Sequence, residues 1–267
     1  MSSHNIKRLL AVILAASVAL CAFASCAKNP DAEDGGQKSD DKVTYGIPSV
    51  GVGRVSKTET PEKPPEKTGI VICIDPGHGF VDGGCGEGLL GELLEKDVNL
   101  AIAKLLDEDL RNLGYTTIMT HDGVNIPTWD TNGNKIFSAT ERVVYVNTLD
   151  IDYLVSIHVN SNSDTSVSGL WICYEQNARK VNDWSQGVAE RISGAMTVNA
   201  VDVSKITLKN EYSLALTRET YAAASLIEIG FATNSSDAEK MLDPTWQSAL
   251  AQSIADGIDD FFKGGDN

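Results

Sequence analysis

Short apolar runs alternate with longer amphipathic runs between residues 70 and 262, and this alternation restricts the chain to few folds. The run at 70–74 is continuous and mostly β-branched, as in a strand buried on both faces of a sheet. Residues 97–113 instead carry apolar side chains at helical spacing, and Gly114 then favours a helix end. Strands that alternate with helices predict an α/β fold. We expect a single domain with a mainly parallel or mixed central sheet and helices on both faces.

The rest of the pattern extends the same architecture. Ser138 and Glu141 form a capping-box pair, which predicts the start of a helix. Further strands are expected at 116–120, 153–159, 170–174 and 225–231, and further helices at 138–146, 182–196 and 245–262. We therefore place one folded domain at residues 68–264, a length sufficient for a single hydrophobic core.

The N-terminus has the features of a secretory signal rather than of a folded segment. Lys7 and Arg8 precede an apolar run at 9–23, the order of charged and apolar residues that directs export. Phe23-Ala24-Ser25-Cys26 then resembles a bacterial lipobox, with phenylalanine in place of the usual leucine. The sequence predicts a lipoprotein-type signal peptide at 1–25 and a lipid on Cys26 that anchors the chain to a membrane.

Two other interpretations of this region stay open. Ala22-Phe23-Ala24 also fits ordinary signal cleavage, and residues 9–27 approach the length of an uncleaved membrane anchor. All three interpretations place the rest of the chain outside the cytoplasm, in the cell envelope or secreted. Residues 26–67 follow with a glycine pair, several prolines and many charges but no sustained period, which predicts a flexible linker.

The charge balance excludes one class of partner. With 22 Lys and Arg against 37 Asp and Glu, the net charge is −15, so no surplus of cations is available for nucleic-acid phosphates. Five cysteines in 267 residues are too few for a scaffold built on disulfides. Cys73 and Cys173 fall on expected core strands, where we expect small buried apolar side chains.

Polar side chains interrupt or follow three of the expected strands. His78 lies directly after the first strand, in Asp75-Pro76-Gly77-His78-Gly79, and His158 lies near the end of another. Glu228 places a carboxylate inside an otherwise apolar strand, and Glu95 lies at the start of the first helix. In open α/β sheets, ligands bind beyond the carboxyl ends of the strands. Two histidines and a carboxylate can bind zinc and leave a fourth position for water, as in catalytic zinc sites.

These segments resemble the zinc-dependent N-acetylmuramoyl-L-alanine amidases known as amidase type 3. The resemblance covers about residues 70–262. It rests on five separated motifs in the family's order: Ile74-Asp75-Pro76-Gly77-His78-Gly79, Glu95-Lys96-Asp97-Val98-Asn99-Leu100, Glu141-Arg142 with Asn147, Ser156-Ile157-His158-Val159-Asn160, and Glu228-Ile229-Gly230-Phe231 with Asn234. One such motif would be weak support, but five in order are specific.

The resemblance implies one zinc ion held by His78, Glu95 and His158, with Glu228 as the catalytic carboxylate. It also implies hydrolysis of the amide bond between N-acetylmuramic acid and L-alanine in peptidoglycan and muropeptides. Zinc would lower the pKa of a bound water and polarise the amide carbonyl, and Glu228 would pass a proton to the departing amine. The apolar neighbours of Glu228 predict a raised pKa, which suits that role. The domain at 68–264 is then a zinc amidase catalytic domain.

Each of these residues also has an interpretation without a function. His78 could be an ordinary loop histidine, and His158 could be a buried histidine with satisfied hydrogen bonds. Glu95 could simply stabilise a helix N-terminus, and Glu92, three residues earlier, competes for the ligand role. Glu228 could form a structural salt bridge, with Arg218 as its partner.

Four further residues are left outside the site. Arg142 and Asn147 match the family, but an arginine on a helix face usually pairs with solvent or with a neighbour. His121 departs from the family, which has arginine there, and we expect a surface or structural role for it. Cys85 lies between two expected ligands, yet three other ligands already suffice for zinc.

Two other functions stay open. The chain could be a non-catalytic cell-wall-binding lipoprotein or regulator on the same fold, because fold does not fix function. Such a relative would be expected to lose one of the four site residues, all of which are present. The chain could also be a zinc peptidase acting on stem peptides, which needs the same local chemistry on a different binding surface. The sequence leaves the oligomeric state open.

Overall fold

The computed structural model describes residues 68–264, except for 86–88, 92, 126–137 and 176–183. The expected signal peptide at 1–25, its lipidated Cys26 and the linker at 26–67 lie outside the described residues and stay predictions. Contacts divide the chain into the units 1–59 and 60–267, and every described residue belongs to the second. Within the described part of the chain, no helix has both the length and the apolar character that crossing a membrane requires.

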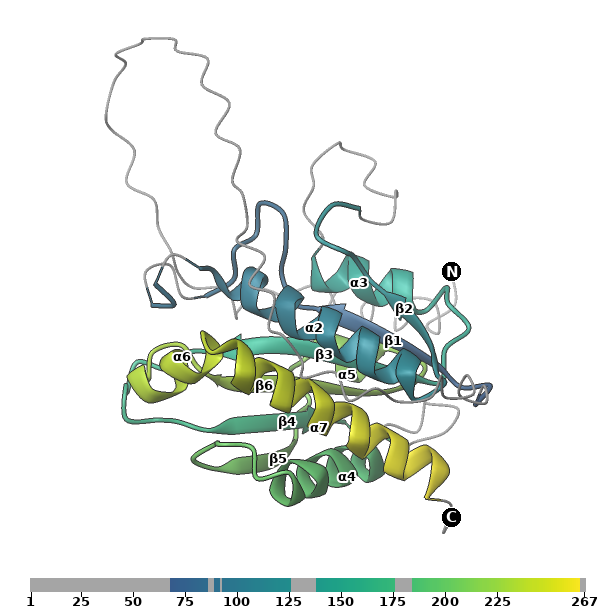
Figure 1. Ribbon diagram of the computed structural model, residues 1–267. Coiled ribbons are helices and arrows are strands. Elements are labelled where there is room, and N and C mark those ends of the chain that lie inside the picture. The colour runs from purple at the N-terminus through teal and green to yellow at the C-terminus, as the bar shows by residue number, and fades with distance from the viewer. Residues whose placement is uncertain (1–67, 86–88, 92, 126–137, 176–183, 265–267) are drawn as a thin grey trace, which may run out of the picture. The chain divides into compact units, whose positions relative to one another are not determined.

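A mixed six-stranded sheet forms the centre of the domain (Figure 1). The strand order is β2-β1-β3-β6-β4-β5, in which β2, β1, β3 and β6 are mutually parallel. Strand β4 runs antiparallel to β6, and β5 runs parallel to β4. The strands are β1 (Val71–Pro76), β2 (Thr116–Met119), β3 (Tyr153–Asn160), β4 (Leu170–Tyr174), β5 (Ile206–Asn210) and β6 (Ala223–Phe231).

Helices cover both faces of this sheet, as the sequence predicted. Figure 1 shows α2, α7 and α4 side by side across one face, with α7 between the other two. Helices α3 and α5 pack on the opposite face, over Cys73, Leu154 and Ala224. The described helices are α2 (Glu95–Asn112), α3 (Ala139–Val146), α4 (Ser185–Val198), α5 (Ala215–Glu219), α6 (Ser235–Met241) and α7 (Pro244–Lys263).

Helix starts follow from local capping chemistry. The predicted capping box of α3 is present: Ser138 Oγ accepts a hydrogen bond from the Glu141 N–H, and Glu141 Oε2 accepts one from the Ser138 N–H. Helix α2 begins at Glu95, two residues earlier than its apolar period suggests, and Asp97 accepts a hydrogen bond from the Leu94 N–H. Such caps satisfy backbone donors that have no partner inside the helix.

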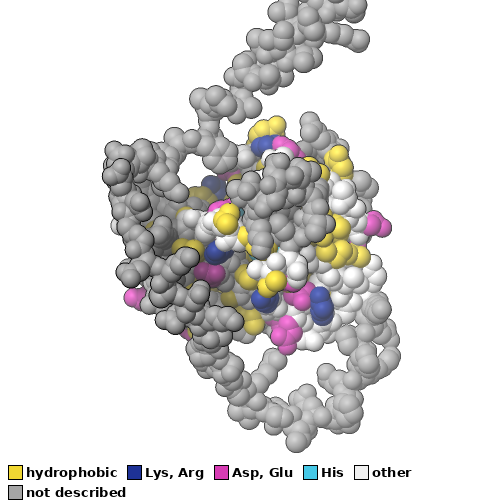
Figure 2. Space-filling model, turned by 90° about the horizontal axis from the view of Figure 1, so that it is seen from above, with side chains coloured by type: hydrophobic (Ala, Val, Ile, Leu, Met, Phe, Trp, Pro, Cys, Tyr) yellow, Lys and Arg dark blue, Asp and Glu magenta, His cyan; other side chains and the backbone are white. Residues whose placement is uncertain are grey.

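Three elements were not predicted, namely β5, α5 and α6. Strand β5 lies at the edge of the sheet, and its apolar and polar side chains alternate only over residues 206–209, a run too short to stand out. Helices α5 and α6 have five and seven residues, too few for a helical period to stand out. On the face seen in Figure 2, the visible described side chains mix hydrophobic, basic and acidic types, and no large patch of one sign is seen.

The crossing of α7 over α4 generates a stability prediction. A Cβ at Gly257 of α7 would lie 2.4 Å from the Cα of Ile192 in α4, whereas a Cβ at Gly194 meets nothing within 4 Å. We expect Gly257→Ala to lower the free energy of unfolding by about 1–3 kcal/mol, because the helices must separate. Gly194→Ala, the matched control, should raise it by about 0.5–1 kcal/mol through helix propensity. Urea unfolding followed by circular dichroism measures both, and equal effects of the two changes would contradict the close packing.

Candidate functional site

The carboxyl ends of β1, β3 and β6 lie next to one another because these three strands are parallel neighbours. His78 follows the end of β1 by two residues, and His158 lies near the end of β3. The register pairs His158 directly with Glu228 of β6. The sequence-predicted residues at three strand ends therefore meet at one edge of the sheet, the usual place for ligands in this architecture.

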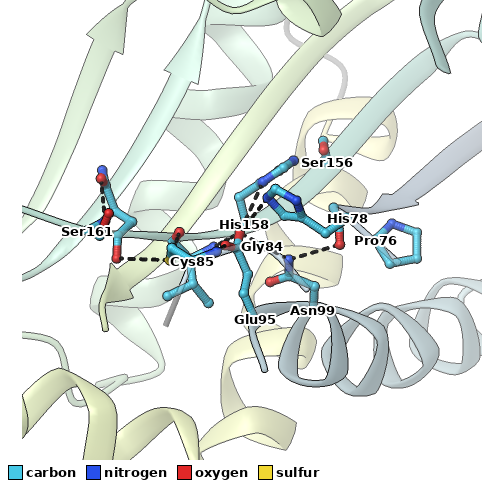
Figure 3. Close-up of polar contacts among 12 residues, drawn as sticks. Pro76, His78, Gly84, Cys85, Glu95, Asn99, Ser156, His158 and Ser161 are labelled. Atoms are coloured by element: carbon cyan, nitrogen blue, oxygen red, sulfur yellow. Dashed lines mark hydrogen bonds and ion pairs between the residues drawn. The ribbon is translucent and has the colours of Figure 1, made fainter. Parts of the chain in front are cut away.

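Glu95 brings the two histidines together (Figure 3). Its Oε1 lies 3.2 Å from His78 Nε2 and 3.3 Å from His158 Nδ1, and the three donor atoms lie within 4.8 Å of one another. Tetrahedral zinc with bonds of ~2.0–2.1 Å places its ligand atoms about 3.3 Å apart. Both the donor types and their spacing fit such an ion, so this group can hold a metal. Among the described residues it is the only group of three or more His, Cys, Asp and Glu with that property.

Backbone and side-chain donors fix the Glu95 carboxylate. Oε2 accepts a hydrogen bond of 2.7 Å from the Cys85 N–H, and Oε1 accepts one of 2.9 Å from the Val159 N–H. Burial alone would raise the pKa of Glu95, but hydrogen bonds with His158 and His78 outweigh it and lower the pKa. Glu95 is therefore held ionised, the state that a metal ligand needs. Glu92, the alternative ligand, lies outside the described residues.

Asp82 orients His78 and was not anticipated from the sequence. Its Oδ2 lies 2.9 Å from His78 Nδ1, which leaves Nε2 facing Glu95. Burial would lower the pKa of His78, yet hydrogen bonds with Glu95 and Asp82 raise it to about 9. A carboxylate on the far nitrogen is the usual support for a metal-binding histidine. The available sequence signal was an aspartate four residues after His78 in the same loop.

Glu228 differs from Glu95 in having few partners. The residue is half-buried, and its Oε2 is a buried atom without a hydrogen-bond partner in the described part of the chain. Burial raises its pKa, although His158 acts in the opposite direction. The predicted direction of the shift is thus confirmed. The salt bridge considered for Glu228 is absent among the described residues, because Arg218 pairs with its neighbour Glu219 at 2.6 Å.

Arg142 is not the ordinary helix-face arginine that the sequence suggested. Its guanidinium is buried and donates hydrogen bonds of 2.6 Å to Asp75 Oδ1 and 2.9 Å to the Pro76 carbonyl. It also donates to the carbonyl of His78 itself. Burial would raise the pKa of Asp75, but Arg142 and hydrogen bonds from two hydroxyls lower it to about 2. Arg142 thus fixes the backbone that presents His78.

The remaining residues have structural positions. His121 is buried, its Nε2 lies 2.8 Å from the Pro76 carbonyl oxygen, and this agrees with the structural role expected for it. Asn147 was left out, yet it joins α3 to the segment before β6, because its side chain bonds the Glu219 carbonyl and the Tyr221 N–H. Cys85 contributes its N–H to Glu95 and is no member of the donor group.

The thiols behave as the sequence predicted. Cys73 and Cys173 are buried on their strands, and both are free, as is Cys85. Burial also raises the pKa of the Cys173 thiol to about 12, so it stays uncharged and packs as an apolar group.

An α/β domain with a His–Glu–His donor group and a separate carboxylate at parallel strand ends is a candidate metal-dependent hydrolase. Comparison with known proteins identifies the family within this class. The family model for N-acetylmuramoyl-L-alanine amidases matches residues 72–260. The chain therefore belongs to the N-acetylmuramoyl-L-alanine amidase family and is an enzyme of that class.

Individual relatives agree with this assignment. The germination-specific N-acetylmuramoyl-L-alanine amidase of Bacillus subtilis is 30% identical over 199 residues, which cover 73% of this chain and 81% of the relative. The crystal structure of an N-acetylmuramoyl-L-alanine amidase from Clostridium difficile is 26% identical, with a TM-score of 0.63, covering 74% of this chain and all of that one. The catalytic domain of the amidase CwlV from Bacillus (Paenibacillus) polymyxa is 25% identical, with a TM-score of 0.60, covering 73% and 98%.

The Arg142–Asp75 pair generates the next prediction. Arg142→Met leaves the Asp75 carboxylate buried without its charged partner, so we expect a loss of about 3–5 kcal/mol in the free energy of unfolding. The control is Arg191→Met, since Arg191 pairs with Asp260 at 2.8 Å while about half of each side chain is exposed. That exposed pair should contribute less than about 1 kcal/mol. Chemical denaturation of both variants checks the difference. Similar small losses in the free energy of unfolding would contradict a structural role of Arg142 at the site.

Proposed function

We propose that this chain is a zinc-dependent hydrolase that cleaves the amide bond between N-acetylmuramic acid and L-alanine in peptidoglycan. One observation carries the proposal: Glu95 lies between two imidazoles, and Glu228 lies beside His158 on the next strand. The family to which the chain belongs supports the same reaction and the same polymer as substrate.

His78, Glu95 and His158 are the residues that would hold the ion. Bound zinc supplies an activated water molecule and a Lewis acid for the amide carbonyl. The protein's own contribution is the orientation of these ligands: Asp82 holds one ring, and backbone N–H groups hold the Glu95 carboxylate. Held in this way, the ligands lose little freedom when an ion binds.

Glu228 is the proposed proton carrier. Among the described residues its Oε2 has no hydrogen-bond partner to displace, and burial raises its pKa, which favours proton uptake. An amide nitrogen leaves poorly unless it is protonated, so the reaction needs an acid after it has used a base. Glu228 can serve as both in turn, because it would take a proton from water and deliver it to the L-alanine nitrogen.

The other two candidate functions have less support. A non-catalytic relative would have no need to keep Glu228 Oε2 beside His158 without a hydrogen-bond partner among the described residues. A peptidase acting on stem peptides would use the same groups, but the family model and the named relatives are amidases of the muramyl bond. We infer no nucleic-acid partner for a chain with a net charge of −15.

Substitutions at Glu228 and His158 separate metal binding from proton transfer. Glu228→Gln should keep stoichiometric zinc and lower kcat on purified peptidoglycan by roughly 10²–10⁴-fold, because only the proton carrier is lost. His158→Ala should lose both zinc and activity. Glu190→Gln on α4, an exposed change distant from the strand ends, is the matched control. Metal analysis and the release of free L-alanine amino groups are the two readouts.

Two outcomes would overturn this assignment. Full activity of Glu228→Gln would show that a group other than Glu228 carries the proton. If the wild type binds zinc but releases no amino groups from peptidoglycan, the proposed hydrolysis is wrong and the non-catalytic alternative is favoured.

We also propose that the enzyme acts outside the cytoplasm, anchored by a lipid on Cys26. The support is the signal-like N-terminus together with relatives that are described as cell wall amidases. Cys26→Ala should release the protein from the membrane fraction, because the acylated residue is removed. Cys21→Ala in the preceding apolar run keeps the lipobox and should leave the protein bound. Cell fractionation with mass spectrometry checks this, and membrane retention of Cys26→Ala would contradict lipidation.

A further inference from the structure

The row of side chains that contains His158 and Glu228 continues onto β4, the strand that runs antiparallel to β6. Strands β3 and β6 pair His158 with Glu228, and strands β6 and β4 pair Glu228 with Trp171. Residues paired across neighbouring strands project to the same face of a sheet. Trp171 therefore lies directly beside the proposed proton carrier, on the side away from His158.

Lys209 of β5 places a positive charge over this tryptophan. Its Nζ lies 3.6 Å from the centroid of the Trp171 ring, and its side chain is 33% exposed. An ammonium over an indole face is attracted by the negative face of the ring, which holds the charge in one place. The ring is itself fixed, since it packs edge-to-face with Phe231 at a centroid distance of 5.1 Å.

This ammonium keeps hydrogen-bond donors available. Lys209 forms an ion pair with Oε2 of Glu211 at 3.8 Å, which is too long for a hydrogen bond, and Oε1 of the same carboxylate accepts from Ser213, so the N–H groups of the ammonium remain available to a closer carboxylate. Other cations near the site are bonded differently: Lys96 donates to the Phe80 carbonyl, and Arg142 donates to Asp75. Lys209 is thus a fixed, accessible cation in a strongly acidic chain, next to the proposed catalytic carboxylate.

The proposed function gives this cation a substrate group to meet. The carbonyl that is attacked must lie at the donor group of His78, Glu95 and His158, while the departing nitrogen must lie within reach of Glu228. The sheet order places β4 and β5 beyond β6, seen from β3. The half of the substrate that leaves with the amine, the peptide, therefore extends toward Trp171 and Lys209.

We propose that Lys209, held on Trp171, forms a subsite for a carboxylate of the peptide that is released. This inference rests on the proposed function and adds the chemical class of group that is recognised next to the scissile bond. A lysine ammonium is a suitable partner for a peptide carboxylate at a partly exposed position. A sugar ring is the less suitable occupant, because the Lys209 ammonium already covers that face of Trp171.

The test compares two soluble substrates that differ only in charge: N-acetylmuramoyl-L-alanyl-D-glutamate, and the same compound with both glutamate carboxyls amidated. The wild type should prefer the acid. Lys209→Met should lower kcat/KM about tenfold on the acid, mainly through KM, and change it little on the amide. Lys209→Arg should retain most of the preference, because it keeps the charge. Lys104→Met, an exposed change on α2, is the control for net charge.

The same comparison is made by calorimetric binding in a Glu228→Gln background, where hydrolysis is suppressed. Tighter binding of the acid that disappears with Lys209→Met supports the subsite, whether or not the wild type hydrolyses the compounds. Failure of the wild type to hydrolyse either compound would overturn only the proposed reaction. Hydrolysis of both compounds at equal rates, with equal binding, would overturn the subsite and leave the amidase function standing. An equal loss on both compounds, accompanied by a lower melting temperature, would reduce Lys209 to a support for the edge strand.

Discussion

The buried ion pair between Asp75 and Arg142 is the interaction on which the candidate metal site depends. Asp75 is the penultimate residue of β1, and it also accepts hydrogen bonds from Thr120 after β2 and Ser156 in β3. Desolvating two charges is costly unless hydrogen bonds satisfy the remaining atoms, and here they do. The same guanidinium donates to the carbonyl of His78, whose left-handed backbone (φ 62°) needs support from its surroundings. The hydrogen bonds of Asp75 and Arg142 therefore connect β1 and β3 with the residue after β2, helix α3 and the loop that carries His78.

Local sequence patterns predict much of this arrangement. The features that they do not predict depend on contacts between residues distant in the sequence. The β-branched run before Asp75 and the apolar strand around Glu228 predicted parallel strand ends, and the site lies there. Arg142 was misjudged because helical periodicity marks the buried stripe of α3 by its apolar residues, whereas Arg142 is buried through a partner 67 residues away. Strand β5 was missed for a different reason, since its alternation of apolar and polar side chains covers only residues 206–209, too few to be distinguished from a loop.

Two carboxylates at the same sheet edge differ in their pKa because they differ in their donors. Glu95 receives N–H groups from Cys85 and Val159 and faces two imidazoles, which lower its pKa. Glu228 has a buried oxygen without a hydrogen-bond partner in the part of the chain that the structure describes, so burial dominates and raises its pKa. Divergent pKa values in neighbouring carboxylates are typical of a division of labour between a permanent anion and a proton carrier. The lowering comes from the two imidazoles of His158 and His78, while main-chain N–H groups of the ligand loop and of β3 hold the Glu95 carboxylate in place between them.

The reversal of β4 and β5 explains why the active edge can hold both reaction chemistry and substrate contacts. Parallel strands contribute their carboxyl ends to this edge, and these ends supply His78, His158 and Glu228. Because β4 is antiparallel, it contributes its amino-terminal part instead, so Trp171 near the start of β4 meets Glu228 near the end of β6. A wholly parallel sheet would have placed another strand end, and another crossover loop, at that position. The mixed sheet instead extends a row of in-register side chains from His158 through Glu228 to Trp171, and this is the row along which we propose that the substrate lies.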